Sequence, residues 1–221
     1  MREVQKCHIS YIMIGSVPCH AILLMNRGNE MRLFAAIMIT GQCHEALAGT
    51  LEVMKQSGIS GRFVPAKNLH ITLAFIGTQE SAEPVVNALR SISFRPFEIS
   101  LSTTGMFGDT FWAGTEDCEE LEALAEQVRQ KLSDAGIPYD TKDFVPHITL
   151  VRRMKGSAEE LTLPHSSMTV SSISLMNSEP GSGSPVYKEI ALFRNTDETD
   201  AIHDNMFPQN SDKINALTED L

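Results

Sequence analysis

Several features are scarce in this 221-residue chain, and each scarcity excludes a class of protein. The four cysteines form no C-x-x-C pair and no cluster, which argues against a disulfide framework or a structural zinc site and favours a reducing, cytoplasmic compartment. Basic side chains number 18 against 28 acidic ones, and this net charge of −10 disfavours sequence-indifferent binding of long nucleic acids. No Gly-rich phosphate loop of the Walker type is present, so we expect no dependence on ATP.

A long hydrophobic run is also missing. The stretch 9–25 is apolar enough to resemble a signal-peptide core, but Gly15 and Pro18 interrupt it and no A-x-A cleavage site follows. It is shorter than the ~20 residues that a helix needs to cross a bilayer. We therefore expect no membrane association, and we interpret residues 1–30 as a non-essential leader or an overlong start assignment, with the functional domain beginning at Met31.

One tetrapeptide, HITL, occurs twice, at residues 70–73 and 147–150. On a strand, side chains alternate between the two faces, so His70 and Thr72 project together while the intervening isoleucine and the leucine project from the back. His147 and Thr149 repeat this arrangement. Two such strands facing each other would enclose a pocket with two imidazoles and two hydroxyl groups.

This combination favours phosphodiester chemistry without a metal or another cofactor. Imidazole has an unperturbed pKa of about 6.5, so two histidines can serve as base and acid in one reaction near neutral pH. A threonine hydroxyl donates a hydrogen bond to a phosphate oxygen without adding charge. A lone histidine on a strand is usually an ordinary half-buried residue, but an identical repeat favours a catalytic role. A metal site built on His70 and His147 ranks last, because no carboxylate accompanies either histidine at ligand spacing.

The hydrophobic periodicity predicts three helices and a larger number of strands. The expected helices span 40–56, 81–92 and 117–135, and the expected strands span 31–39, 70–76, 97–103, 110–114, 147–153, 168–177 and 186–193, with a short extended segment at 63–65. Each half of this order holds a helix and one HITL strand, which indicates an internal duplication. We expect an α+β protein of two lobes with the active groove between them.

The last part of the chain has a different composition. Residues 194–221 carry seven acidic and two basic side chains among Asn and Thr residues, which is typical of a mostly disordered acidic tail. The predicted organisation is a leader over 1–30, a catalytic domain over 31–193 and a tail over 194–221.

Several segments together resemble a known family. MRLFAAI, NLHITLAFIG, FVPHITLVRR, SLMNSE and VYKEIALF, in this order over about residues 31–193, are similar to the RNA 2',3'-cyclic phosphodiesterases of the 2H phosphoesterase superfamily, first described as 2'-5' RNA ligases. The resemblance implies a bilobal, duplicated fold in which two antiparallel sheets face each other across a groove, with helices outside. It also implies hydrolysis of 2',3'-cyclic phosphates to 2'-phosphates without metal.

Carried across residue by residue, the resemblance assigns catalysis to His70 and His147 and phosphate binding to Thr72, Thr149 and Arg152. Strict alternation along the strand would instead turn Arg153 to the groove, so a bulge must intervene if Arg152 is the functional cation. Phe75 occupies, in the first copy, the position of Arg152 in the second. It is a candidate for stacking on a nucleobase, and core packing is the alternative.

Three functions stay open on the sequence alone. The first is a phosphoric diester hydrolase that acts on RNA ends or small cyclic nucleotides, as a monomer and with no cofactor. The second is reversible 2'-5' ligation, in which a ribose 5'-hydroxyl replaces water. The third is a non-catalytic module that binds RNA ends or nucleotides, although binding alone needs no acid–base pair.

Overall fold

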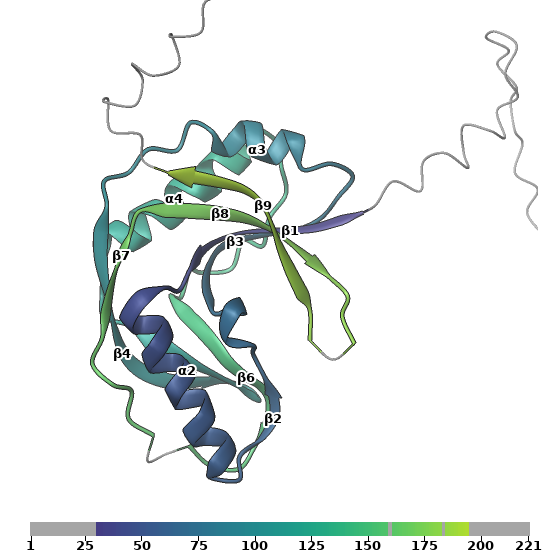
Figure 1. Ribbon diagram of the computed structural model, residues 1–221. Helices are drawn as coiled ribbons and strands as arrows, with labels where there is room; N and C mark the ends of the chain where they lie inside the picture. The colour runs from purple at the N-terminus through teal and green to yellow at the C-terminus, as the bar shows by residue number, and fades with distance from the viewer. Residues whose placement is uncertain (1–29, 159–160, 183, 195–221) are drawn as a thin grey trace, which may run out of the picture.

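The computed structural model describes residues 30–158, 161–182 and 184–194, and the leader and tail expected at the two ends lie almost entirely outside these ranges. Within them, no helix is long and apolar enough to cross a lipid bilayer. In chain order the elements (Figure 1) are β1 (Met31–Met38), α2 (Gly41–Gln56), β2 (Ser60–Phe63), the 3-10 helix η1 (Ala66–Asn68), β3 (His70–Gln79), α3 (Glu83–Leu89), β4 (Phe97–Phe107), β5 (Thr110–Thr115), α4 (Glu119–Asp134), β6 (His147–Lys155), β7 (Ser167–Val170), β8 (Ser172–Glu179) and β9 (Val186–Arg194).

The strands follow the order β7-β4-β5-β6-β3-β1-β8-β9, with β2 paired to β6 beside this path, and every pairing is antiparallel. The α+β, two-lobed architecture is confirmed. One lobe contains β7, β4, β5, β6 and β2, and the other contains β3, β1, β8 and β9. The two lobes are halves of one continuous sheet, joined by strand pairing at the β3–β6 seam, where a single residue pair, Ile71 with Ile148, is in register.

That seam joins the two HITL segments. Because the pairing is antiparallel, the register continued from Ile71 and Ile148 places Thr72 across from His147 and His70 across from Thr149. Each histidine is therefore aligned with the threonine of the other copy. The alternation expected from the sequence holds here, since the isoleucines and leucines are buried while the histidines and threonines are only half-buried.

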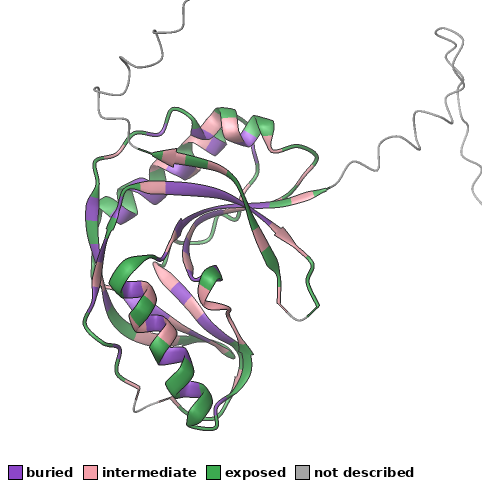
Figure 2. Ribbon diagram, viewed as in Figure 1, coloured by how far each residue is buried: buried purple, intermediate pink, exposed green. Residues whose placement is uncertain are grey.

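The helices cover the outer faces of the lobes and carry the apolar stripes that the sequence predicts. Leu47, Leu51 and Met54 of α2 are buried, and Figure 2 shows buried and exposed residues alternating along this helix. In α4 the buried residues recur at helical spacing, and three glutamates in its first turn favour the positive end of the helix dipole. α2 contacts β7, α3 contacts α4, and α4 contacts β3 (Figure 1).

Two short elements differ from the predicted pattern. The segment expected to be merely extended near residues 63–65 forms strand β2 and then η1, and β2 pairs with β6, some 90 positions later in the chain. The strand expected over 168–177 is divided into β7 and β8, which pair with β4 and β1 respectively. Both differences arise from pairing partners that are distant in sequence, so local periodicity does not reveal them.

Candidate active site

Both HITL strands depart from regular alternation at the same position. In β3 the neighbouring residues Leu73 and Ala74 are both buried, and in β6 Leu150 and Val151 are both buried. Leu73 has no partner in the register of β1, and Leu150 has none in the register of β5. Each strand therefore contains a bulge just after its threonine, which shifts the following side chains by one residue.

The bulges determine which residues reach the groove. After each bulge, the fifth residue beyond the histidine returns to the histidine face, and these residues are Phe75 and Arg152. Both line the cavities described below. Arg153, the alternative from strict alternation, lines neither of them and has a positive φ of 53°, which is unusual for a residue with a side chain.

Two adjoining cavities form the groove. One, of about 430 Å³, contains His70, and the other, of about 610 Å³, contains His147. Thr72, Phe75 and Arg152 line both cavities and so form their common boundary. The structure thus brings together five of the six residues expected from the sequence. The sixth, Thr149, is half-buried next to the seam and lines neither cavity.

Each imidazole is oriented by the backbone two residues before it. The Nδ1 atom of His70 lies 2.6 Å from the carbonyl oxygen of Asn68, and Nδ1 of His147 lies 2.8 Å from that of Val145. Because a carbonyl only accepts hydrogen bonds, Nδ1 carries the proton that is donated to it. In the neutral ring this leaves the lone pair on Nε2, the nitrogen that a general base needs.

Aromatic rings flank both histidines. The ring centroids of Phe34 and Tyr187 lie 5.1 and 5.4 Å from that of His70. The centroids of Phe107 and Trp112 lie 5.0 and 6.3 Å from that of His147. These contacts limit the motion of each imidazole and reduce its access to water.

The environment of His70 favours the neutral imidazole. Burial lowers the pKa of His70 below its usual value of 6.5, and the positive charge of Arg152 and the proximity of His147 lower it further. The hydrogen bond to the Asn68 carbonyl acts in the opposite direction, because it favours the protonated ring. His70 is therefore predominantly neutral at physiological pH in the free protein.

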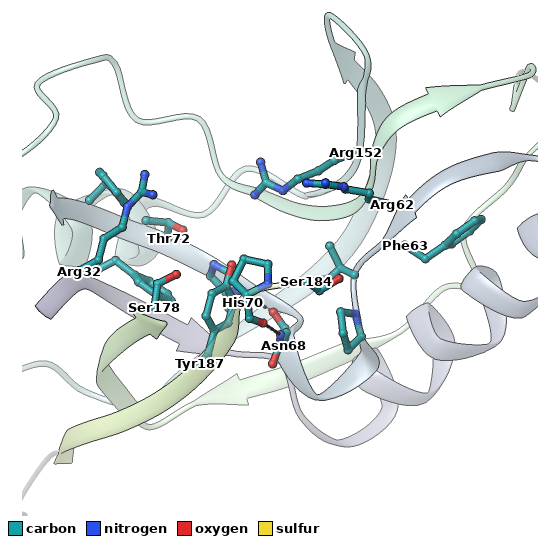
Figure 3. Close-up of a pocket in the computed structure, with 15 residues that line it drawn as sticks. Arg32, Arg62, Phe63, Asn68, His70, Thr72, Arg152, Ser178, Ser184 and Tyr187 are labelled. Atoms are coloured by element: carbon teal, nitrogen blue, oxygen red, sulfur yellow. Dashed lines mark hydrogen bonds between the residues drawn. The ribbon is translucent and has the colours of Figure 1, made fainter. Parts of the chain in front are cut away.

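Several groove residues carry no sequence signal of their own. Figure 3 shows Arg32 and Arg62 on opposite sides of the His70 cavity, with Arg152 near Arg62 and Tyr187 beside His70. Arg32 lies on β1 and Tyr187 on β9, while Arg62 lies on β2. Nothing in their local patterns distinguishes them from solvated polar residues, because only the strand pairing brings them to one place.

The 3-10 helix residue Asn68 links His70 to the β8–β9 loop. Its side chain is buried, and its Nδ2 donates a hydrogen bond of 3.2 Å to the carbonyl oxygen of Pro185 (Figure 3). Its own carbonyl accepts the hydrogen bond from His70. One residue thus fixes both the imidazole and the loop that precedes Tyr187.

The arrangement suits an anionic ligand. Among the described residues that line the His70 cavity there are three arginines and no Asp or Glu. In the same described ranges, no group of three or more His, Cys, Asp or Glu side chains is placed to hold a metal ion. Two imidazoles, a threonine hydroxyl and an arginine around one groove can transfer protons and stabilise charge on a phosphate.

A family model and individual relatives both match this chain and indicate related functions. A family model described as the 2'-5' RNA ligase superfamily matches residues 44–181. The RNA 2',3'-cyclic phosphodiesterase of Archaeoglobus fulgidus is 32% identical over 178 residues, which cover 74% of this chain and 99% of that protein. The enzyme of the same name from Thermotoga maritima is 27% identical over 175 residues, covering 72% and 92%.

Solved structures agree with these matches. The crystal structure of Escherichia coli LigT complexed with 3'-AMP aligns with a TM-score of 0.64 and 27% identity, covering 76% of this chain and all of that one. The apo form of the same protein aligns with a TM-score of 0.65.

Proposed function

Since this chain belongs to the 2'-5' RNA ligase superfamily, we propose that it hydrolyses 2',3'-cyclic phosphate ends of RNA to 2'-phosphates by metal-independent, two-histidine catalysis. The observation that carries this proposal is the pair of histidines. The Nδ1 atom of each imidazole lies within hydrogen-bond distance of a backbone carbonyl oxygen, which orients the ring. The cavities of the two histidines adjoin, and Thr72 and Arg152 line both.

The reaction needs one proton taken and one proton given. A neutral imidazole accepts a proton from water through Nε2 while the water oxygen forms a bond to phosphorus. The bond from phosphorus to the ribose 3'-oxygen breaks, and the second imidazole, in its protonated form, donates to that oxygen. The product keeps its phosphate on the 2'-oxygen, and the pair of imidazoles has exchanged protonation states.

Charge on the nonbridging phosphate oxygens grows as water attacks. Arg152 lies at the boundary of the two cavities, where its guanidinium can offer two parallel hydrogen bonds, and Thr72 adds an uncharged donor. Thr149 lines neither cavity, and its proposed contact with the phosphate rests on the family resemblance and on its alignment with His70 across the seam. Such stabilisation is usually the largest contribution to catalysis. Phe75, on the same boundary, offers a ring face for the terminal base.

A direct assay tests the proposal. The purified protein, in excess EDTA, should convert an RNA ending in a 2',3'-cyclic phosphate to the 2'-phosphate. His70→Ala and His147→Ala should each lower kcat by about 10²- to 10⁴-fold, the usual contribution of a general acid or base. His165→Ala is the matched control, because His165 is exposed and lines neither cavity. Full turnover in either active-site variant, with the fold intact by circular dichroism, would reject the mechanism.

Ligation is the second candidate, favoured by the family description itself. A ribose 5'-hydroxyl in the position of the attacking water would form a 2'-5' linkage with the same proton transfers. Incubating two RNA fragments, one ending in a cyclic phosphate and one starting with a 5'-hydroxyl, separates the outcomes. A joined product resistant to a 3'-5'-specific nuclease indicates ligation.

A further inference from the structure

The cavity beside His70 holds more positive charge than a cyclic phosphate requires. A 2',3'-cyclic phosphate is a diester with one negative charge, whereas Arg32, Arg62 and Arg152 all line this cavity. No Asp or Glu is among its described lining residues, although the chain as a whole carries a net charge of −10. The three ion pairs found among the described residues all involve lysine, so none neutralises these arginines.

The strand pairing brings two of these charges face to face. Arg62 of β2 lies directly opposite Arg152 of β6 in the antiparallel register. Like charges in directly opposed positions destabilise a sheet, because their side chains share one face. Figure 3 shows the two guanidinium groups near each other at the edge of the cavity. An anion between them would remove this repulsion.

Arg32 approaches from the other lobe. It lies on β1, and its guanidinium is 5.0 Å from the centre of the Phe75 ring, at the boundary of the two histidine cavities. Arg32 and Arg62 therefore flank the groove from both lobes, with His70 between them (Figure 3).

The groove continues beyond the two histidine cavities. A further cavity of about 500 Å³ shares five residues with the His70 cavity: Arg32, Arg62, Ser178, Ser184 and Pro185. Arg152 does not line it, so the side-chain donors of this extension are the other two arginines and the hydroxyl groups of Thr78, Ser178 and Ser184. Its remaining lining includes Glu30 and Glu179, of which Glu179 is paired with Lys188 at 2.8 Å.

We propose that Arg32 and Arg62 form a second phosphate subsite, so that the preferred substrate is a cyclic phosphate carrying another phosphate group on its terminal nucleotide. This inference rests on the proposed function and specifies its substrate class. The second group is either the internucleotide phosphodiester of an RNA chain or a 5'-phosphate on a mononucleotide. Arg152 and Thr72 then serve the reacting phosphorus, while Arg32 and Arg62 hold the neighbouring phosphate.

The test compares three substrates that share one adenine base. They are adenosine 2',3'-cyclic phosphate, its 5'-phosphorylated form, and the dinucleotide ApA ending in a 2',3'-cyclic phosphate. The measured quantity is the ratio of kcat/KM for each two-phosphate substrate to that for the nucleoside substrate. We expect ratios of about ten or more, since a hydrogen bond to a charged group contributes about 1.5–3 kcal/mol and these arginines are exposed. A high ratio for ApA alone assigns the subsite to the internucleotide phosphate of an RNA chain. High ratios for both two-phosphate substrates show that the subsite accepts an internucleotide phosphate and a 5'-phosphate alike.

Arg62→Gln and Arg32→Gln should each lower these ratios about tenfold, and 0.5 M salt should lower them in the wild type because exposed charges are screened. The matched control is Arg95→Gln, which removes an exposed arginine outside all three cavities and should keep the wild-type ratio. Arg62→Gln should not lower the Tm, since it relieves the repulsion with Arg152. Ratios near one in the wild type, or an Arg62→Gln ratio equal to that of Arg95→Gln, would overturn the subsite.

Binding of unreactive products keeps this test separate from the proposed function. Calorimetry compares the affinities of adenosine 2'-phosphate and adenosine 2',5'-bisphosphate in the wild type and in Arg62→Gln. If no cyclic phosphate is hydrolysed but the bisphosphate binds about tenfold more tightly through Arg62, the reaction is wrong and the subsite stands. If hydrolysis occurs but the two affinities are equal and the kcat/KM ratio for ApA is also near one, the reaction stands and the subsite is wrong.

Discussion

His70 shows how one environment sets the protonation state of a reacting group. Burial and the nearby Arg152 charge lower the pKa of His70, so in the free protein its imidazole should titrate below 6.5. NMR titration of the ring Cε1 proton measures this directly, and His70→Gln assigns the signal. A midpoint at or above 6.5 would contradict the environment described here.

The same shift affects stability in a defined direction. The unfolded chain takes up the proton near pH 6.5, whereas the folded protein resists it until lower pH, so the free energy of unfolding falls as the pH drops below 6.5. The loss is complete only below the folded-state pKa. Denaturant titrations at several pH values should show a smaller loss in His70→Gln than in the wild type. Equal losses in both proteins would mean that another group titrates.

Asn68 is expected to affect substrate binding more than the proton transfer. Asn68→Ala removes the donor to the Pro185 carbonyl but keeps the backbone carbonyl that orients His70. The loop before Tyr187 then loses its attachment, so KM should rise several-fold while kcat changes less. Stability should fall by about 0.5–1.5 kcal/mol, the usual net contribution of one hydrogen bond, because the Pro185 carbonyl belongs to an exposed residue and can bond to water instead. Asn87→Ala, at an exposed position of α3, is the control, and a loss confined to kcat would refute this role.

At the scale of elements, β2 lies close to the part of β6 that follows its bulge. A Cβ atom at Gly61 would lie 2.7 Å from Cγ1 of Val151, 3.0 Å from the carbonyl oxygen of Arg152 and 3.1 Å from that of Arg153. Gly61→Ala should therefore push β2 from β6, destabilise the protein by about 1–3 kcal/mol and lower kcat/KM by displacing Arg152. Thermal unfolding and steady-state kinetics measure the two effects.

Gly49 provides the matched control for this substitution. A Cβ atom there meets nothing within 4 Å, and the residue lies inside α2, where alanine is the better helix former. Gly49→Ala should leave kcat/KM unchanged and raise the stability slightly. An equal loss in both alanine variants would show that the β2–β6 contact is not the cause.

Periodicity predicted the elements well where the signal is local. The stripes of α2 and α4 and the alternation over the first four residues of each HITL strand are all confirmed. It did not predict the two bulges, because the pairs Leu73-Ala74 and Leu150-Val151 look like any apolar dipeptide. The assignment of Arg152 to the groove came instead from the family resemblance, which indicates the residue but not the bulge that turns its side chain to the groove.

At the scale of the whole molecule, the duplicated motif predicted the groove but not its full lining. Two strands with identical tetrapeptides indicated that their polar faces would meet, and the seam register is consistent with this. Arg32, Arg62 and Tyr187 lie far apart in the sequence. They converge because β2 pairs with the distant strand β6, and because β9 joins β1 through the distant strand β8. A single sequence contains no measure of such pairing.

The boundaries of the functional unit give the last prediction. The described strands begin with β1 at Met31 and end with β9 at Arg194, and the site residues named above for the proposed reaction lie between these limits. We therefore propose that residues 31–194 form the catalytic domain and that residues 1–30 are dispensable. A protein of residues 31–194 should keep kcat/KM within about twofold, and its Tm should change by less than about 4 °C, the effect of roughly 1 kcal/mol in a domain of this size.

Removing 1–30 and 195–221 separately identifies the responsible end if either value changes more. Because 195–221 carries seven acidic side chains, a change confined to RNA substrates and abolished by salt would show that the tail acts on the groove electrostatically.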